Sequence, residues 1–225
     1  MTAEKAIGAP SPAGRLSRDL VLRTAITIAD AEGLTALSMR RLGIALGVQA
    51  MSLYNHVQNK DDLIDGMSGT LVADMGIPVE EDVSWERAIV VIATAFRRLA
   101  HAHPSLFAMV HDRALRSPES LAPFERCLAI FRRAGFDPES ALYVFSTAAS
   151  FVAGFALSEI ANGQVAPATC RSPSVLPPGV DLAAFPRVAE AALYLDRNHR
   201  DAAFAFGLDA LIAGIRARAR HADGS

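Results

Sequence analysis

The chain has 225 residues, of which 51% are hydrophobic and 20% are charged, with 22 basic against 24 acidic side chains. This composition excludes a disordered tail protein, a collagen-like chain and a disulfide-stapled miniprotein, and the length is ample for a sizeable core. The net charge of −2 argues against a nucleic-acid-binding protein, because such proteins usually present a basic surface.

The N-terminal segment 1–14 is rich in Gly, Pro, Ala and Ser, and we expect it to be a disordered tail. It lacks an apolar run long enough for a signal peptide. Cys127 and Cys170 are too few for a secreted disulfide framework, although a single bridge between them is compatible with the sequence. We therefore expect a cytoplasmic protein.

Four helices are predicted in the segment 15–75. Residues suited to capping a helix N-terminus open the first, second and fourth of them: Ser17, Ser38 and Asn59. Glycines suited to ending a helix close the first two: Gly33 and Gly47. The third helix is short and is expected at 49–54.

A boundary is expected at 76–84, where Gly and Pro are followed by three successive acids. Beyond it, longer helices are predicted at 85–102, 104–115, 118–134, 138–161, 186–197 and 199–220. No strand-like alternation persists anywhere in the chain. The sequence therefore predicts an all-α fold.

The run Ala141–Ser158 contains no charged residue over 18 positions, which is long enough for a transmembrane helix. It carries four Ser and Thr side chains, however, and no Lys/Arg flank marks its ends. A membrane helix and a buried helix at a subunit interface are both compatible with the run. We expect the buried helix and no membrane.

The segment 38–56, SMRRLGIALGVQAMSLYNH, fits a helix-turn-helix unit with Gly47 at the turn. The spacing alone fits an ordinary helical hairpin equally well. DNA binding is favoured by the polar side chains of its second half: Gln49, Ser52, Tyr54, Asn55 and His56. The local charge agrees, since Arg15 to Lys60 contains six bases and three acids.

The segment 16–75 strongly resembles the DNA-binding domain of the tetracycline-repressor (TetR) family of bacterial transcription regulators. The resemblance is carried by ADAEGLTALSMRRL, LGV and SLYNHVQNKDDL. The remainder is similar, more loosely, to the ligand-binding domain of the same family through RRLAHAHPSLF and RRAGFDPESA. The resemblance implies a three-helix DNA-binding domain at 15–75 and a larger helical ligand-binding and dimerisation domain at 76–225. It also implies a homodimeric repressor that binds a palindromic operator and is released by an unknown small-molecule effector.

The resemblance implies a set of DNA-contacting residues: Arg40, Gln49, Ala50, Met51, Ser52, Tyr54, Asn55, His56 and Lys60. The family varies at Asn55, and Ala50 and Met51 offer apolar contacts rather than hydrogen bonds to bases. Other roles stay open for three of the residues. Tyr54 can pack on the first helix, His56 can bond locally, and Lys60 can balance the aspartates that follow it.

The resemblance also implies that the helices Pro138–Ala161 and His199–Arg220 form a dimer interface, and both are too apolar to face solvent alone. Candidates for an effector pocket are aromatic or soft side chains: Phe96, Phe107, Met109, Tyr143, Phe151 and Phe155. Taken singly, each of them is more typical of a plain core. We expect no metal site and no cofactor. Phosphate-loop, zinc-protease and nucleophile-elbow motifs are absent, so we expect no enzyme. The alternative is a helical small-molecule-binding or interaction protein that does not bind DNA.

Overall fold

The structure is a computed structural model that describes residues 16–76, 83–113, 115–161, 181–192 and 198–222. The expected tail at 1–14 lies outside these residues. In chain order the helices and short 3-10 turns are α1 (Arg18–Glu32), η1 (Leu34–Ala36), α2 (Met39–Leu46), α3 (Ala50–Leu53), α4 (Lys60–Ala73), α5 (Trp85–Ala102), α6 (Phe107–Arg113), α7 (Pro118–Arg133), α8 (Pro138–Ala161), η3 (Leu182–Ala184), α9 (Pro186–Ala192) and α10 (Asn198–Ala222). The described residues contain no strand, and the prediction of an all-α fold is confirmed.

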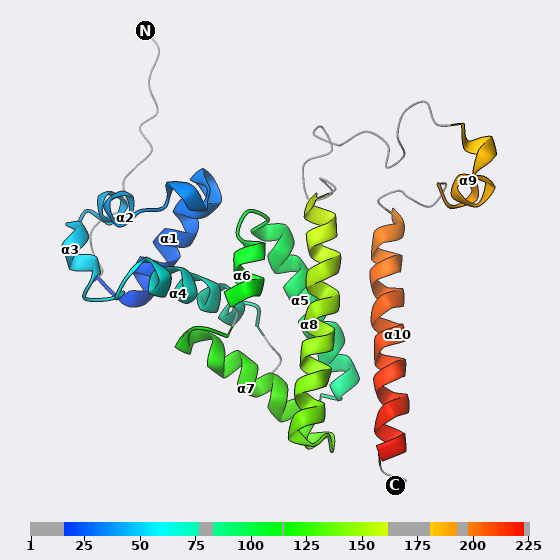
Figure 1. Cartoon of the computed structure of the whole chain (residues 1–225). Coiled ribbons are helices and arrows are strands. Elements are labelled where there is room, and N and C mark those ends of the chain that lie inside the picture. The colour runs from blue at the N-terminus through cyan, green and yellow to red at the C-terminus, as the bar shows by residue number, and fades with distance from the viewer. Residues whose placement is uncertain (1–15, 77–82, 114, 162–180, 193–197, 223–225) are drawn as a thin grey trace.

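The helices form a small N-terminal group and a larger body (Figure 1). The first three lie together at one end of the molecule, and α4 leads from them into the body formed by α5 to α8. The last helix, α10, runs antiparallel beside α8 at the opposite end from α3. The short helix α3 and the long helix α10 therefore lie at opposite ends of the molecule.

The predicted helix starts in the N-terminal group are confirmed by capping hydrogen bonds. The Ser17 hydroxyl accepts from the Leu20 amide at 3.2 Å. The Ser38 hydroxyl accepts from the Arg41 amide at 3.1 Å, and the Asn59 side chain accepts from the Asp62 amide at 2.9 Å. These bonds satisfy amides that have no partner inside the helix.

Several predicted boundaries differ from the structure. The third helix spans Ala50–Leu53 rather than 49–54, and α6 begins at Phe107 rather than at residue 104. α7 ends at Arg133 rather than at 134, α10 spans Asn198–Ala222 rather than 199–220, and the helix predicted at 186–197 is described only as far as Ala192. Before α6 there is a tight turn in which the Leu106 amide donates to the His103 carbonyl at 3.0 Å. This turn allows Leu106 and Phe107 to enter the core, where neither is exposed.

The helix α4 is packed between the N-terminal group and the body, and two glycines make this possible. A Cβ atom at Gly66 would lie 2.7 Å from a methyl group of Leu22 in α1. A Cβ atom at Gly69 would overlap the hydroxyl of Ser117, at the start of α7. Because any larger residue would push a neighbour away, these two positions fix how closely α4 approaches both halves of the chain.

A cluster of ion pairs around the buried Glu159 joins α5, α8 and α10. Glu159 of α8 is only 3% exposed, and it accepts hydrogen bonds from the Arg97 Nε and the His101 Nε2 of α5, each at 2.9 Å. Arg97 also pairs with Asp201 of α10 at 2.7 Å and lies over the Phe204 ring. The cluster thus joins three helices, and its partners compensate the cost of burying the carboxylate.

The apolar helix α8 is long and apolar enough to cross a membrane by length and composition, and it alone among the described helices meets that test. Within one chain, 28% of its most apolar window is buried. It packs against α5, α7 and α10, while Leu142 and Tyr143 remain exposed. The expected burial of this helix is therefore only partial in a single chain.

The two helices of the helix-turn-helix cross at Gly43. A Cβ atom there would lie 2.9 Å from the Val48 carbonyl oxygen and 3.2 Å from the Ala50 amide. The contact is with backbone, which cannot rotate out of the way as a side chain could. We expect Gly43→Ala to lower the free energy of unfolding by about 1–3 kcal/mol through overpacking.

The change at Gly43 is measured by urea unfolding. The matched control is Ile44→Ala on the same helix, because the Ile44 side chain is 66% exposed and its truncation should change stability by less than about 0.5 kcal/mol. An unchanged or higher stability for Gly43→Ala would contradict the close crossing of α2 and α3.

Candidate nucleic-acid interface and buried cavity

The nine residues proposed to contact DNA all lie outside the core of the N-terminal group. Six of them are exposed: Arg40, Gln49, Met51, Tyr54, Asn55 and Lys60. The other three are partly buried: Ala50, Ser52 and His56. Between them Leu53 is completely buried and holds α3 against the core. The short helix therefore has one anchored side and one free side, as a recognition helix requires.

Of the nine residues proposed to contact DNA, three lie in the turn that follows α3 rather than on the helix: Tyr54, Asn55 and His56. Residues 54–59 form this segment, which we call the α3–α4 turn. The amides of His56 and Val57 both donate to the Leu53 carbonyl, at 2.9 and 3.0 Å. The chain turns here because Val57, which is 1% exposed, must enter the core.

Most of the basic side chains in this region are paired with acids. Arg18 bonds Asp62 and Glu119. Arg23 pairs with Asp19 and Asp74, and Arg41 pairs with Glu32. Three of these partners, Asp62, Asp74 and Glu119, lie beyond Lys60 and so outside the segment whose charge is +3. Of the six bases that contribute to this charge, Arg18, Arg23 and Arg41 are therefore neutralised by ion pairs.

Two cations of this region have no ion-pair partner among the residues that the structure describes. They are Arg40, in the first turn of α2, and Lys60, at the start of α4, and both are exposed. The Asp62 carboxylate beside Lys60 is turned inward, where it accepts from Arg18 at 2.8 Å and from the Gln58 amide at 2.7 Å. Lys60 is thus free of one of the two competitors that the sequence suggested.

Sequence reasoning missed Ile44, an exposed apolar residue on α2 close to the residues proposed to contact DNA. Ile44 of α2 is 66% exposed, and Met51 of α3 is 73% exposed. Ile44 departs from the apolar face formed by Leu42 and Leu46, and this departure is the signal that could have identified it. A free apolar side chain next to polar ones can contact the methyl group of thymine.

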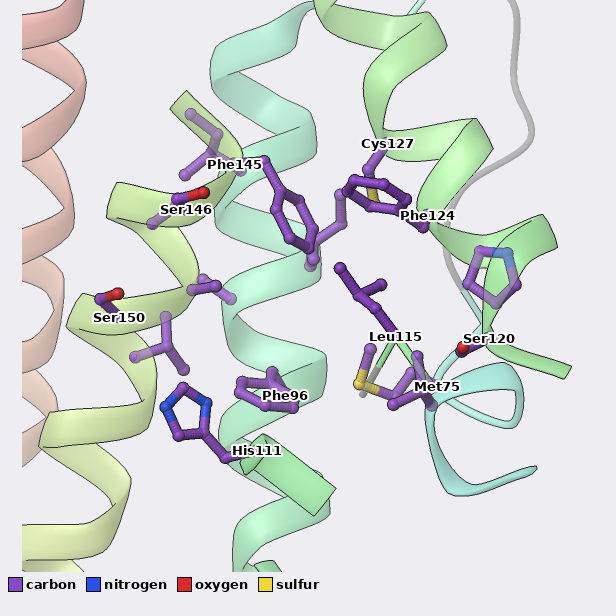
Figure 2. Close-up of a pocket in the computed structure, with 18 of the residues that line it drawn as sticks. Met75, Phe96, His111, Leu115, Ser120, Phe124, Cys127, Phe145, Ser146 and Ser150 are labelled. Atoms are coloured by element: carbon purple, nitrogen blue, oxygen red, sulfur yellow. The ribbon is translucent and has the colours of Figure 1, made fainter. Parts of the chain in front are cut away.

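The body contains a cavity of about 420 Å³ that is partly open to solvent and that α4 to α8 all border. Its walls are mainly aromatic and aliphatic, and Figure 2 shows Phe124 and Phe145 facing each other at one end. Their ring centroids lie 4.8 Å apart in an edge-to-face arrangement. Leu115 points into the middle of the cavity, and Met75 lies at the end of α4 (Figure 2). The cavity is large enough for a small organic ligand.

Three polar side chains lie along one side of the cavity. Ser146 and Ser150 are one helical turn apart on α8, and His111 of α6 lies near them (Figure 2). None of these three side chains has a hydrogen bond to any part of the chain that the structure describes. They are therefore available to a ligand. Asp112, Arg116 and Ser120 add further polar groups to the lining.

Of the six predicted pocket residues, Phe96 lines this cavity and the other five lie elsewhere. Phe107 is buried behind Phe96, with ring centroids 5.0 Å apart. Met109 packs against the core of the N-terminal group, and Tyr143 is 60% exposed and donates to Glu139. The last two pack against Phe204 of α10: the Phe151 ring is stacked on it, and the Phe155 ring meets it edge to face.

A metal site was not expected, and the described residues contain no group of three or more His, Cys, Asp and Glu side chains placed to hold an ion. His111, which belongs to no such group among the described residues, lines the cavity. Cys127 also lines the cavity as a free thiol, and burial raises its pKa to about 12. Cys170, its possible disulfide partner, lies outside the described residues.

A comparison with protein families finds one match that covers most of the body. Residues 77–219 match the family described as tetracyclin repressor-like, C-terminal domain. The match includes α5 to α9, most of α10, and every cavity residue from those helices.

Curated relatives match the N-terminal group as well. The tetracycline repressor protein class E of Escherichia coli is 31% identical over 91% of this chain and 92% of its own length. An HTH-type transcriptional regulator of Saccharopolyspora erythraea is 32% identical over 64% of this chain, which spans 61% of that relative.

Solved structures share the arrangement of the helices. Apo ActR of Streptomyces coelicolor is 31% identical, superposes with a TM-score of 0.75, and is matched over 95% of this chain and 100% of its own. The same regulator in complex with actinorhodin is 29% identical, with a TM-score of 0.74 and 92% and 99% coverage.

The Asp62 carboxylate gives a test of how the turn is held. The hydrogen bond from Arg18 lowers the pKa of Asp62 below its ordinary value. A lowered pKa means that this group stabilises the folded state above the unfolded pKa and loses that contribution as the pH falls through the folded value.

We therefore expect Asp62→Asn to lower the free energy of unfolding by about 1–2 kcal/mol at pH 7, and the difference from wild type to shrink below about pH 4. Urea unfolding at several pH values measures it. The control is Asp61→Asn, because the neighbouring Asp61 side chain is 80% exposed and its contact with Arg113 is long, at 3.4 Å. A difference at Asp62 that does not change with pH would contradict the ion pair.

Proposed function

The chain belongs to the tetracycline-repressor (TetR) family of transcriptional regulators, and we propose that it represses transcription by binding a palindromic operator as a homodimer. The observation that carries the proposal is the free side of α3. There, exposed polar and apolar side chains lie beside the two unpaired cations, Arg40 and Lys60. The relatives are regulators rather than enzymes, and we propose no catalytic activity.

We propose that residues 15–75 form the DNA-binding domain and residues 76–225 the ligand-binding and dimerisation domain. In this division α3 enters the major groove, Gln49 to Ser52 face the bases, and Tyr54, His56 and Lys60 contact the phosphate backbone. Met51 is suited to a thymine methyl group because it is apolar and free. A cytoplasmic location follows, because the binding partner is chromosomal DNA.

The proposed dimer forms through α8 and α10 of each chain. These helices leave Leu142, Tyr143 and Phe206 exposed, and Phe206 reaches 76%. An open groove between the two helices is lined by Val144, Leu211 and other residues. Covering this apolar face with a second copy would form a four-helix bundle. A twofold dimer would place its recognition helices about 34–36 Å apart on the operator.

The effector is proposed to occupy the cavity of the body. Four phenylalanine rings line it, together with polar side chains from three helices and the turn between α6 and α7: His111, Asp112, Arg116, Ser120, Ser146 and Ser150. This lining fits a largely apolar, aromatic molecule that carries hydrogen-bonding groups at more than one position. The ActR complex with actinorhodin supports a ligand within a fold of this kind. Ligand binding would displace α4, which borders both the cavity and the N-terminal group, and would lower operator affinity.

DNA binding is tested with a duplex that the wild-type protein selects from a random pool. Replacement of both free cations, Arg40→Ala with Lys60→Ala, should weaken binding by at least about tenfold. The slope of log K against log salt concentration should become shallower by about 1 for each phosphate that is no longer neutralised. The control is Arg23→Ala, because Arg23 is exposed but paired with Asp19 and Asp74.

The binding constants are measured by fluorescence anisotropy across a salt titration. Equal losses of affinity for the double variant and for Arg23→Ala would contradict the assigned contacts. Failure of the wild-type protein to enrich any duplex would instead support a helical small-molecule-binding protein without DNA binding.

The effector cavity is tested by filling it. Ser150 lines the cavity and is exposed to solvent, so Ser150→Trp should occupy space at the cavity wall without disturbing the core. We expect compounds that raise the wild-type Tm in a thermal-shift screen to lose that effect, while operator affinity stays within about twofold. Compounds that stabilise both proteins equally would show that the effector binds elsewhere.

A further inference from the structure

A single guanidinium in α1 contacts three separate parts of the chain. Arg18 Nη1 donates to the His56 carbonyl at 2.9 Å. Its Nη1 and Nη2 also form a fork with the Asp62 carboxylate, at 3.2 and 2.8 Å. Its Nε donates to Oε1 of Glu119 at 2.7 Å. The side chain is 30% exposed, so its ion pairs are partly shielded from water.

Two of these contacts hold the α3–α4 turn. The His56 carbonyl belongs to the turn itself, and Asp62 accepts the Gln58 amide at 2.7 Å as well as the Arg18 fork. Arg18 therefore fixes the backbone on which Tyr54, His56 and Lys60 are carried. Such support decides how accurately those side chains meet the phosphates.

The third contact reaches the cavity wall. Glu119 lies in the first turn of α7, and the next residue, Ser120, lines the cavity together with Pro123 and Phe124. Burial raises the pKa of Glu119, but the hydrogen bond from Arg18, together with smaller contributions from its other partners, outweighs burial and keeps the carboxylate ionised. A movement of α7 that accommodates a ligand would therefore displace Glu119 and, through their hydrogen bond, the Arg18 side chain.

We propose that Arg18 is a positioning residue that couples the cavity to the α3–α4 turn through Glu119 of α7. This inference rests on the proposed function, since it assumes that the turn contacts DNA. The path differs from a displacement of α4, because it runs from α7 to the turn through one side chain of α1. Coupling is reciprocal, so DNA bound at the turn must also act on the cavity.

Reciprocity allows a test that does not need the effector. Cys127 lines the cavity and is 1% exposed, and its pKa of about 12 leaves little thiolate at neutral pH. Its labelling by a thiol reagent therefore reports the opening of the cavity. The change Cys170→Ser removes the other cysteine of the chain and leaves one reporter.

The experiment compares the labelling rate of Cys127 with and without a saturating selected duplex. In the Cys170→Ser protein, the duplex should slow labelling at least about threefold, because it fixes the turn and, through Arg18, the start of α7. Adding Glu119→Gln should abolish this effect and weaken operator binding. The matched control is Glu125→Gln on α7, whose exposed carboxylate has no ion-pair partner among the described residues and which should behave as wild type.

Equal slowing with Glu119→Gln and wild type, or no slowing in wild type that has bound the duplex, would overturn the proposal. Circular dichroism and Tm check that each variant is folded. If Glu119→Gln is unfolded, Arg18→Lys provides the same test, because it keeps the charge but cannot form all four hydrogen bonds at once. Failure of the wild-type protein to bind the duplex appears in the anisotropy titration before any labelling, and would overturn the function on which the inference rests.

Discussion

The close packing of α4 against both halves of the chain is the constraint on which the rest of the structure depends. Gly66 and Gly69 lie one helical turn apart and leave no room for a side chain beside α1 and α7 respectively. The same helix begins at Lys60, in the surface proposed to contact DNA, and is followed by Met75 at the cavity wall. Because one rigid helix borders both surfaces, the proposed switch needs only a displacement of α4 to connect them.

Ion pairing limits the positive charge that this chain, with a net charge of −2, can present to DNA. The bases of α1 and α2 that pair with acids serve to hold helices together, as Arg18 and Arg41 show. The side chains left for phosphate are few, namely Arg40 and Lys60 among the described residues. A dimer presents this set twice to one duplex, which compensates for the small number in each chain.

Local signals in the sequence were sufficient for the helices and the turn, and insufficient for the cavity. Ser17, Ser38 and Asn59 cap helices because their side chains act on amides three residues away, which a sequence pattern can reveal. The apolar helix α8 offers no such pattern. Since nearly every side of it is apolar, the sequence could not distinguish Phe145, which faces the cavity, from Phe151, which faces α10. The Arg18–Glu119 pair joins residues 101 positions apart, and no local rule predicts it.

We propose that the protein reads duplex DNA as a twofold dimer with α3 in the major groove. Hydroxyl-radical footprinting combined with methylation protection, on a duplex selected by the wild-type protein, measures this arrangement. We expect two equivalent protected segments on one face of the duplex, with centres about 10 base pairs or a multiple of that apart, and guanine N7 atoms protected within them. A single asymmetric segment, or guanines that remain fully reactive inside the footprint, would contradict it.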